Sequence, residues 1–365
     1  MRFPTYQDLS KEQDDVNNLP LKGNYLVTGP PGTGKTVMAL YRGKALAGRR
    51  ESVQLLMHGR LLSQYTSQVV GHLGIDGVVN TFFSWLGKWC RSNWGVNTPQ
   101  VEPYRPDWTR IIELAIEKPP ARGAQPHLLV DEGQDMAPEF FMFAKSVAKG
   151  LTVFADENQR ITDDNSTLAE IRTKIRPDAE LKLTRNYRNT REIALVARHF
   201  VADSPTGVPE LPERTGPKPE LAAHPRTHES AQRIATYAGN FKRQQIGVIV
   251  PNDKKLLSIY RNRLAAALPD SVRLQHYSNK GKTEVEFDTP GVTLLHWASA
   301  KGLEFDAVFL PELQAVRQEL GSPLLHMQLH VLCSRARERL FLSYTGEGRP
   351  AIASLLPLDL IKVVP

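Results

Sequence analysis

Short apolar runs alternate with longer helical patterns along the whole chain. In the first half, four runs are typical of buried strands, at 25–28, 53–57, 128–130 and 151–154. The second half continues with five more, at 181–183, 246–250, 292–296, 307–310 and 340–343. Strands that alternate with helices form parallel sheets covered by those helices. The pattern therefore predicts an α/β protein with two mainly parallel sheets, one in each half.

The boundary between the two halves is predicted near Arg176-Pro177-Asp178, where a helical pattern at 167–174 ends and a new strand begins. We therefore expect an N-terminal lobe at 1–177 and a C-terminal lobe at 178–365. A proline-rich stretch at 204–219 is the second candidate boundary. Because a strong motif precedes that stretch and belongs with the segments after it, we interpret the stretch as a surface connection inside the second lobe.

A glycine-rich segment lies between the first strand and the helix that comes after it. It fits the pattern G-x-x-x-x-G-K-[ST] and comprises Gly29, Pro30, Pro31, Gly32, Thr33, Gly34, Lys35 and Thr36. Glycines let backbone N–H groups close around phosphate oxygens, and the N-terminus of the next helix adds positive potential. Lys35 would contact the β- and γ-phosphates, and Thr36 would offer its hydroxyl to Mg²⁺. The alternative, a chance glycine-rich turn, is disfavoured by the flanking strand and helix. The segment predicts a nucleoside triphosphate site.

Two adjacent acids, Asp131 and Glu132, end the predicted strand at 128–130. Beside a phosphate-binding loop, Asp131 would complete the Mg²⁺ shell and Glu132 would polarise the water that attacks the γ-phosphate. Solvated acids at a strand end are the plain alternative, which the glycine-rich loop disfavours. The next strand again ends with an acid and an amide, Asp156 and Gln159.

Taken in order, these motifs resemble those of superfamily one helicases of the UvrD/Rep/PcrA type. Asp131-Glu132-Gly133-Gln134-Asp135 is similar to that family's D-E-x-Q-D segment. Gln13 matches the glutamine that reads adenine in the family, and Gln159 matches its γ-phosphate sensor. The resemblance runs from Gln13 to Arg335, nearly the whole chain. It implies two RecA-like P-loop NTPase lobes, with the ATP site in the cleft between them and ATP and Mg²⁺ as cofactors.

Three segments of the second half extend the resemblance: 186–188 (N-Y-R), 300–305 (A-K-G-L-E-F) and 334–336 (S-R-A). The resemblance implies that Tyr187 stacks on adenine and that Arg188 reaches the γ-phosphate. It implies further that Gly302 belongs to the nucleotide-binding residues, that Glu304 contacts the ribose and that Arg335 is a second arginine finger. The alternative for Arg188 and Arg335 is that they are surface cations. Tyr187 would then be a packing aromatic, and Lys301-Gly302 an ordinary turn. Arg337 and Arg339 are expected to be structural or surface charges.

The resemblance implies that two segments of the first half, 57–60 and 80–85, contact single-stranded nucleic acid. Arg60, Thr81 and Phe82 would offer a cation, a hydroxyl and a stacking face. Because aromatic residues at near-helical spacing usually bury, we expect Phe83 and its neighbours Trp85 and Trp89 to lie in the core. Lys and Arg outnumber Asp and Glu by 46 − 39 = 7, which favours a polyanionic partner.

The chain departs from the family in having no room for the large inserted subdomains that well-studied members carry. Only about forty residues separate Trp85 from Leu128. Ala298 also replaces the histidine usual before the A-K-G segment. We therefore expect a minimal ATPase that translocates on single-stranded DNA, 3′ to 5′ by resemblance, with duplex unwinding left open. The alternative is an ATP-gated nucleic-acid-binding or regulatory module that licenses a partner such as a nuclease without separating strands.

The cysteine content and the hydrophobic runs of the sequence indicate the cellular compartment. Cys90 and Cys333 are the two cysteines, at no metal-ligand spacing, so a reducing compartment is expected. No signal-like N-terminus and no run of about 20 apolar residues is present. We expect a cytoplasmic protein, a monomer in isolation, that has no membrane association and prefers single-stranded DNA to RNA.

Overall fold

The chain, a computed structural model, is described at residues 8–71, 78–120, 125–156, 166–201, 208–277, 285–287 and 289–364. It divides into two compact units: unit 1 runs to Thr184 and unit 2 begins at Arg185, except that 204–209 group with unit 1. Each unit is built on an all-parallel sheet covered by helices. The α/β fold class predicted from the sequence is confirmed, and the two sheets are consistent with two RecA-like lobes.

The parallel sheet of unit 1 has six strands among the described residues, in the order β3-β2-β6-β7-β1-β8. They are β1 (Asn24–Thr28), β2 (Val53–Met57), β3 (Val79–Thr81), β6 (His127–Val130), β7 (Gly150–Ala155) and β8 (Ala179–Lys182). Every residue of β6 and β7 is buried, as expected for central strands covered on both faces. Because all strands run the same way, the residues just after β1, β6 and β7 meet at one edge of the sheet.

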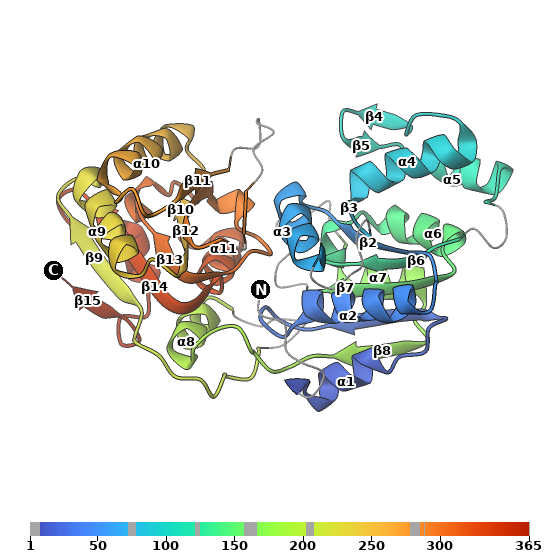
Figure 1. Ribbon diagram of the computed structural model, residues 1–365, viewed down its shortest axis with the longest axis horizontal. Coiled ribbons are helices and arrows are strands. Elements are labelled where there is room, and N and C mark those ends of the chain that lie inside the picture. Colours follow the sequence, from blue (N-terminus) through green and yellow to red (C-terminus); the bar gives the residue numbers. More distant parts are fainter. Residues whose placement is uncertain are drawn as a thin grey trace. The chain divides into compact units, whose positions relative to one another are not determined.

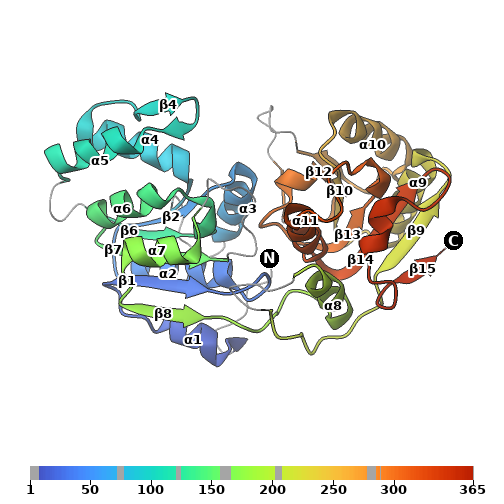
Figure 2. The same cartoon turned by 180° about the vertical axis from the view of Figure 1, so that it is seen from behind.

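The helices of unit 1 cover both faces of this sheet, with α1 and α2 on one face and α6 and α7 on the other (Figures 1 and 2). The helices are α1 (Lys11–Asn17), α2 (Lys35–Gly48), α3 (Arg60–Gly71), α4 (Phe82–Trp94), α5 (Trp108–Glu117), α6 (Pro138–Val147) and α7 (Leu168–Ile175). A short hairpin of β4 (Gln100–Glu102) and β5 (Arg105–Pro106) joins α4 to α5. A 3₁₀ turn, η2 (Gly133–Asp135), comes after β6.

The core of unit 1 beside α4 is strongly aromatic. Trp85 and Trp89 are buried in it, as the sequence predicted. Trp89 packs edge-on against Phe143 of α6, with ring centroids 5.1 Å apart. The described residues between β3 and β6 thus form α4, a hairpin and α5, and the two helices pack on α6.

The strand predicted at 181–183 lies in unit 1, so the boundary at 177/178 was placed seven residues too early. That strand is β8, which pairs in parallel with β1 as the edge of the first sheet. The Glu12 carboxylate of α1 then accepts hydrogen bonds from the Thr184 N–H and hydroxyl, both at 2.7 Å. The chain therefore leaves unit 1 only after Thr184.

The sheet of unit 2 has seven strands in the part of the chain that the structure describes, in the order β11-β12-β10-β13-β14-β9-β15. They are β9 (Glu220–His224), β10 (Gln245–Val250), β11 (Leu274–His276), β12 (Gly291–His296), β13 (Phe305–Leu310), β14 (Ala336–Thr345) and β15 (Lys362–Val364). Helices α9 (Thr227–Asn240) and α10 (Lys254–Ala267) bury their apolar sides against one face of this sheet. Helices α8 (Arg191–His199) and α11 (Pro323–Cys333) pack together beside β14 (Figure 2).

No helix in the described part of the chain is both long and apolar enough to cross a membrane. Cys90 and Cys333 are both buried free thiols, one in each unit. Burial raises the pKa of the Cys333 thiol to about 12, so this side chain stays protonated and behaves as a small apolar group.

Candidate functional site

The glycine-rich loop of unit 1 runs from the end of β1 to the start of α2. Gly29 has no room for a side chain, because an added Cβ would lie 2.6 Å from the Leu183 carbonyl oxygen. Gly34 has a φ of +93° in the left-handed region and precedes the first residue of α2. The two glycines therefore allow the tight path that leaves backbone N–H groups at the beginning of a helix, the usual setting for phosphate.

Lys35 is buried at the start of α2, and its ammonium points back into the loop. Nζ donates to the carbonyl oxygens of Gly29 at 2.5 Å and Pro30 at 3.1 Å. It also lies 3.6 Å from Asp156 Oδ2, beyond the end of β7. The ammonium of Lys35 therefore lies among the loop carbonyl oxygens and beside Asp156.

The acids after β6 lie beside the loop. The Thr36 hydroxyl donates to Asp131 Oδ2 over 2.7 Å, so the two predicted Mg²⁺ ligands are adjacent. Glu132 has a φ of +54°, a conformation uncommon for a residue with a side chain, and it turns the chain into η2. Gln134 Nε2 donates to Glu132 Oε2 at 2.5 Å, and the Asp156 N–H donates to Gln134 Oε1 at 2.9 Å. Gln134 therefore links the two strand ends that carry the acids.

The electrostatics of this cluster favour a bound cation. Asp131, Asp156 and Glu132 are all buried, and Lys35 is the cation beside them. Burial raises the pKa of Asp131, and the neighbouring Glu132 charge raises it further, whereas the Thr36 hydrogen bond and Lys35 oppose the shift. A divalent cation next to Asp131 would stabilise its ionised form.

Oxygen donors from Thr36 and Asp131 suit Mg²⁺, which prefers such ligands and retains several waters or phosphate oxygens. Within the described ranges, no group of three or more His, Cys, Asp or Glu side chains could hold a metal ion. The residues thus fit a Mg²⁺ ion that takes most of its ligands from water and a bound triphosphate.

Gln13 packs against the loop from α1. Its Nε2 donates to the Thr33 carbonyl oxygen at 3.1 Å, and its Oε1 accepts from the Ser10 N–H, which closes a capping box at the start of α1. The side chain is buried. The structure therefore brings Gln13 to the loop, with its amide joined to α1 and to the backbone of Thr33.

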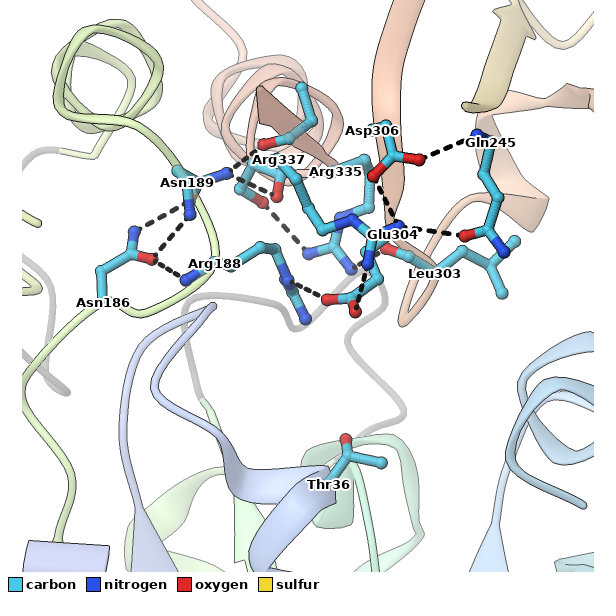
Figure 3. A network of polar contacts seen from close by, with 12 residues as sticks. Thr36, Asn186, Arg188, Asn189, Gln245, Leu303, Glu304, Asp306, Arg335 and Arg337 are labelled. Carbon is cyan, nitrogen blue, oxygen red and sulfur yellow. Dashed lines mark hydrogen bonds and ion pairs between the residues drawn. The ribbon is translucent and has the colours of Figure 1, made fainter. Parts of the chain in front are cut away.

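In unit 2, the three predicted segments meet around Glu304 (Figure 3). Arg188 Nε lies 2.9 Å from Glu304 Oε2, and Arg337 lies 3.7 Å from the other carboxylate oxygen. Burial alone would raise the pKa of Glu304, but the charges of Arg188 and Arg337 and the hydrogen bond from Arg188 lower it. Glu304 is therefore ionised at neutral pH and holds Arg188 in a defined position.

Arg337 belongs to this network, although the sequence suggested only a structural or surface charge. Besides Glu304, its guanidinium pairs with Asp306 at 2.9 Å and donates to Gln245 Oε1 at 3.0 Å. Within β14, Arg337 alternates with its neighbours in direction, so its side chain reaches the beginnings of β10 and β13. The motif pattern marks Arg335 but carries no signal for Arg337.

Arg335 is 1% exposed, and its side chain makes hydrogen bonds to three residues of unit 2. Its guanidinium donates to the carbonyl oxygens of Val331 at 2.8 Å and Leu303 at 3.2 Å, and to Ser334 Oγ at 3.1 Å (Figure 3). These bonds tie the end of α11 to the segment before β13. Arg335 thus lies beside the predicted site segment, but its side chain does not contact Glu304 in any of these bonds.

Two further predicted residues of unit 2 lie at turns. Tyr187 is 42% exposed, with the Arg185 guanidinium 5.6 Å from its ring centroid. Gly302 has a φ of +77°, the left-handed conformation that a glycine adopts at little cost.

Two adjacent aromatics of the predicted nucleic-acid segment differ from the prediction in their burial. Phe82 is 4% exposed, with its ring against Phe140 and Trp108, so the prediction that it offers a stacking face was wrong. Phe83, expected in the core, is only partly buried and lies edge-on to Tyr104, which is 74% exposed on the β4–β5 hairpin. Phe82 and Phe83 point in different directions because consecutive helix residues are rotated by about 100°.

Thr81 is the N-cap of α4, where its hydroxyl accepts a hydrogen bond from the Ser84 N–H at 3.3 Å. Arg60 begins α3, but its side chain lies outside the described part of the structure. Gln159, the predicted γ-phosphate sensor, also lies outside the described residues.

No protein-family model matches this chain, and no curated protein matches it in sequence. Among solved structures, the chain is similar to the C-terminal domain of a possible DNA helicase from Lactobacillus plantarum, with 19% identity and a TM-score of 0.37. That match covers 48% of this chain and 98% of the other. The chain is also similar to arterivirus nonstructural protein 10, a helicase, with 14% identity and a TM-score of 0.40 over 95% of this chain and 64% of the other.

Proposed function

We propose that this protein is a nucleic-acid-dependent ATPase, a minimal superfamily one helicase of the UvrD/Rep/PcrA type that translocates on single-stranded DNA. The observation that carries the proposal is the contact between Thr36 and Asp131, which joins the glycine-rich loop to the acidic strand end. The loop and the acid that are proposed to hold the nucleotide and Mg²⁺ therefore lie together at one edge of a parallel sheet, where such folds bind their ligands.

In this proposal, unit 1 binds the triphosphate and provides the groups that act on water. The loop N–H groups and Lys35 hold the phosphates, and Thr36 with Asp131 holds Mg²⁺, which supplies charge stabilisation when bound. Glu132 accepts a proton from the attacking water and is oriented for this by its hydrogen bond from Gln134. Because the Asp156 N–H donates to Gln134, a shift of Gln134 on γ-phosphate binding or release would also move the end of β7.

Unit 2 is proposed to supply the cations and the base contact. Arg188 would stabilise charge on the transferred phosphoryl group, Tyr187 would stack on the adenine, and Glu304 would contact the ribose. Arg335 is proposed as the second finger that the family resemblance suggests, with its guanidinium held by the bonds to Val331 and Leu303. Such fingers are worth about 10³ to 10⁵ in rate.

The proposal is tested by measuring ATP hydrolysis with single-stranded DNA, single-stranded RNA and duplex at two salt concentrations. We expect stimulation by single strands, DNA above RNA, and a steep loss of stimulation at higher salt. Lys35→Ala is expected to abolish turnover. A wild-type protein that does not hydrolyse ATP with any of these polymers would contradict the proposal.

A second candidate is an ATP-gated module that licenses a partner such as a nuclease without separating strands. The observation that favours it is the small size of the segment between β3 and β6, whose described residues form α4, a hairpin and α5. A strand-displacement assay on duplex with a 3′ tail distinguishes the two candidates. ATPase activity without displacement would favour the gated module, whereas displacement by the isolated protein would favour the helicase.

A further inference from the structure

We infer that Arg214 is a positioning residue for the ATPase reaction, because it holds the main chain of the two arginines that flank Glu304. Arg214 lies in the segment between α8 and β9, outside every motif found in the sequence. Its guanidinium donates to the carbonyl oxygen of Arg188 at 2.5 Å and to that of Arg337 at 2.7 Å. This inference rests on the proposed function, because it assigns Arg214 a role in placing Arg188.

The two carbonyl oxygens belong to segments that are far apart in the sequence and are linked through their side chains at Glu304. Arg188 and Arg337 both pair with this carboxylate. Arg214 joins the same two segments through their backbones. The segments are therefore connected twice, by their side chains at Glu304 and by their carbonyl oxygens at Arg214. A guanidinium suits this role because its N–H groups diverge in a fixed plane.

The segment that carries Arg214 is itself anchored to the beginning of α8. The Arg214 carbonyl oxygen accepts the N–H of Arg191 at 2.8 Å, and the Gly216 N–H donates to the Glu192 carboxylate at 2.6 Å. A Cβ at Gly216 would lie 2.6 Å from Thr190 Cγ2, so only glycine permits this close approach. Arg214 is therefore presented by a fixed backbone, which lowers the entropy lost in forming its two bonds.

Asn189 makes a second tie between the same segments from inside the unit. Its Nδ2 donates to the carbonyl oxygens of Ser334 and Ala336. Asn189 is buried, whereas Arg214 is exposed. Removing Arg214 should consequently leave the fold intact and loosen only the position of Arg188. A misplacement of a catalytic group by about 1 Å can lower the rate about 100-fold. Because the hydrogen bonds of Asn189 remain, we expect a smaller loss of kcat when Arg214 is removed.

The test compares Arg214→Ala with Arg214→Lys and with Lys218→Ala as a matched control. Lys218 lies on the same segment and also donates to a backbone carbonyl oxygen, but that of Asp359. For Arg214→Ala we expect kcat to fall about 10-fold with KM for ATP unchanged, and for Lys218→Ala we expect neither to change. Arg214→Lys should lie between the wild type and Arg214→Ala, because an ammonium group can donate to both carbonyls without the planar geometry.

Chemical rescue separates positioning from a general structural effect. Arg214 lines a cavity of about 390 Å³ together with Thr190, Thr215, Tyr237 and Phe241. A free guanidinium ion can therefore reach the vacated position. Added guanidinium, at concentrations far below those that unfold proteins, should raise kcat of Arg214→Ala and leave that of Lys35→Ala unchanged.

The outcomes are distinct. An active wild type with unchanged kcat in Arg214→Ala would overturn the role of Arg214 and leave the proposed function standing. A fall in kcat that guanidinium does not restore, accompanied by a lower melting temperature, would also overturn it in favour of a structural role. A wild type that does not hydrolyse ATP would overturn the proposed function, and the positioning role with it.

Discussion

The Thr36 hydroxyl donates a hydrogen bond to Asp131 Oδ2 over 2.7 Å, although 95 positions separate the two residues in the chain. Thr36 comes after β1 and Asp131 comes after β6, and these two strands lie on either side of β7. The parallel sheet, rather than any local sequence, therefore brings the two oxygen donors together. The metal and nucleotide chemistry proposed for the site depends on this contact.

The first prediction concerns Asp131→Asn. The amide should accept the Thr36 hydrogen bond but lose the charge that holds Mg²⁺, so we expect kcat for ATP hydrolysis to fall by about 100-fold or more. Titrating Mg²⁺ in a phosphate-release assay measures this, and half-saturation should shift to higher Mg²⁺. Asp178→Asn is the matched control, because Asp178 accepts a hydrogen bond from the Asn24 N–H at the beginning of β1. A variant as active as wild type at low Mg²⁺ would count against Asp131 as a ligand.

The second prediction concerns pH. Burial and the nearby Glu132 raise the pKa of Asp131 from 3.8 to about 7. The folded, metal-free protein thus binds this proton more tightly than the unfolded chain, so this group's contribution to stability is lost as pH rises from about 4 to 7. Mg²⁺ needs the ionised form, so its apparent affinity should rise with pH from 6 to 8.

Two measurements check this pH dependence. Melting temperatures of the metal-free protein from pH 5 to 8 should fall less for Asp131→Asn than for the wild type. Mg²⁺ titrations of ATP hydrolysis at pH 6, 7 and 8 should show a falling half-saturation point in the wild type. Mg²⁺ affinity that does not change over this range would contradict a raised pKa at Asp131.

The third prediction concerns the ion pair between Arg188 and Glu304, in which Nε lies 2.9 Å from Oε2. Arg188→Ala removes the proposed transition-state cation, and we expect kcat to fall about 10³-fold or more with ATP binding largely retained. Arg188→Lys should not restore it, because lysine lacks the planar fork of the guanidinium. Fluorescent-nucleotide binding and single-turnover hydrolysis separate the two effects. Equal loss of binding and turnover would assign Arg188 to ground-state binding instead.

The fourth prediction separates two adjacent aromatics. Phe82 packs against Phe140 in the core, so Phe82→Ala should cost about 3–5 kcal/mol of stability. Phe83 and Tyr104 retain exposed ring surface, so alanine at either should weaken single-stranded DNA binding by about 1–3 kcal/mol with little change in melting temperature. Fluorescence anisotropy with a labelled oligonucleotide and thermal unfolding measure the two properties. Unchanged DNA binding in both Phe83→Ala and Tyr104→Ala would exclude this surface as a base contact.

Much of the fold could be predicted because it depends on local patterns. Nine apolar runs correspond to nine observed strands, including β1, β10 and β14. The position of chemical groups after strands could also be predicted: a parallel sheet brings the ends of its strands together, so the sequence alone pairs Thr36 with Asp131. The short strands β3, β11 and β15, of three residues each, carry too little pattern to be found.

The remaining differences come from packing between elements. The run at 181–183 is typical of a strand in either sheet, and only its pairing with β1 and the contacts of Thr184 with Glu12 assign it to unit 1. Phe82 and Phe83 are chemically alike, and the positions of α5 and α6 decide which one is buried. Arg335 and Arg337 lie two positions apart in an arginine-rich run, and the run does not indicate which of them reaches Glu304.

The most direct test of the central claim is ATP hydrolysis by Glu132→Gln, measured together with ATP binding and single-stranded DNA stimulation. Glu132 is buried beside the loop and accepts a hydrogen bond from Gln134. Because the proposal assigns phosphate and Mg²⁺ binding to other residues, replacing Glu132 removes only the proposed base. We predict that wild-type turnover is stimulated by single-stranded DNA, and that Glu132→Gln binds ATP normally but turns over about 10²- to 10⁴-fold more slowly. Normal stimulated turnover by Glu132→Gln would contradict the account.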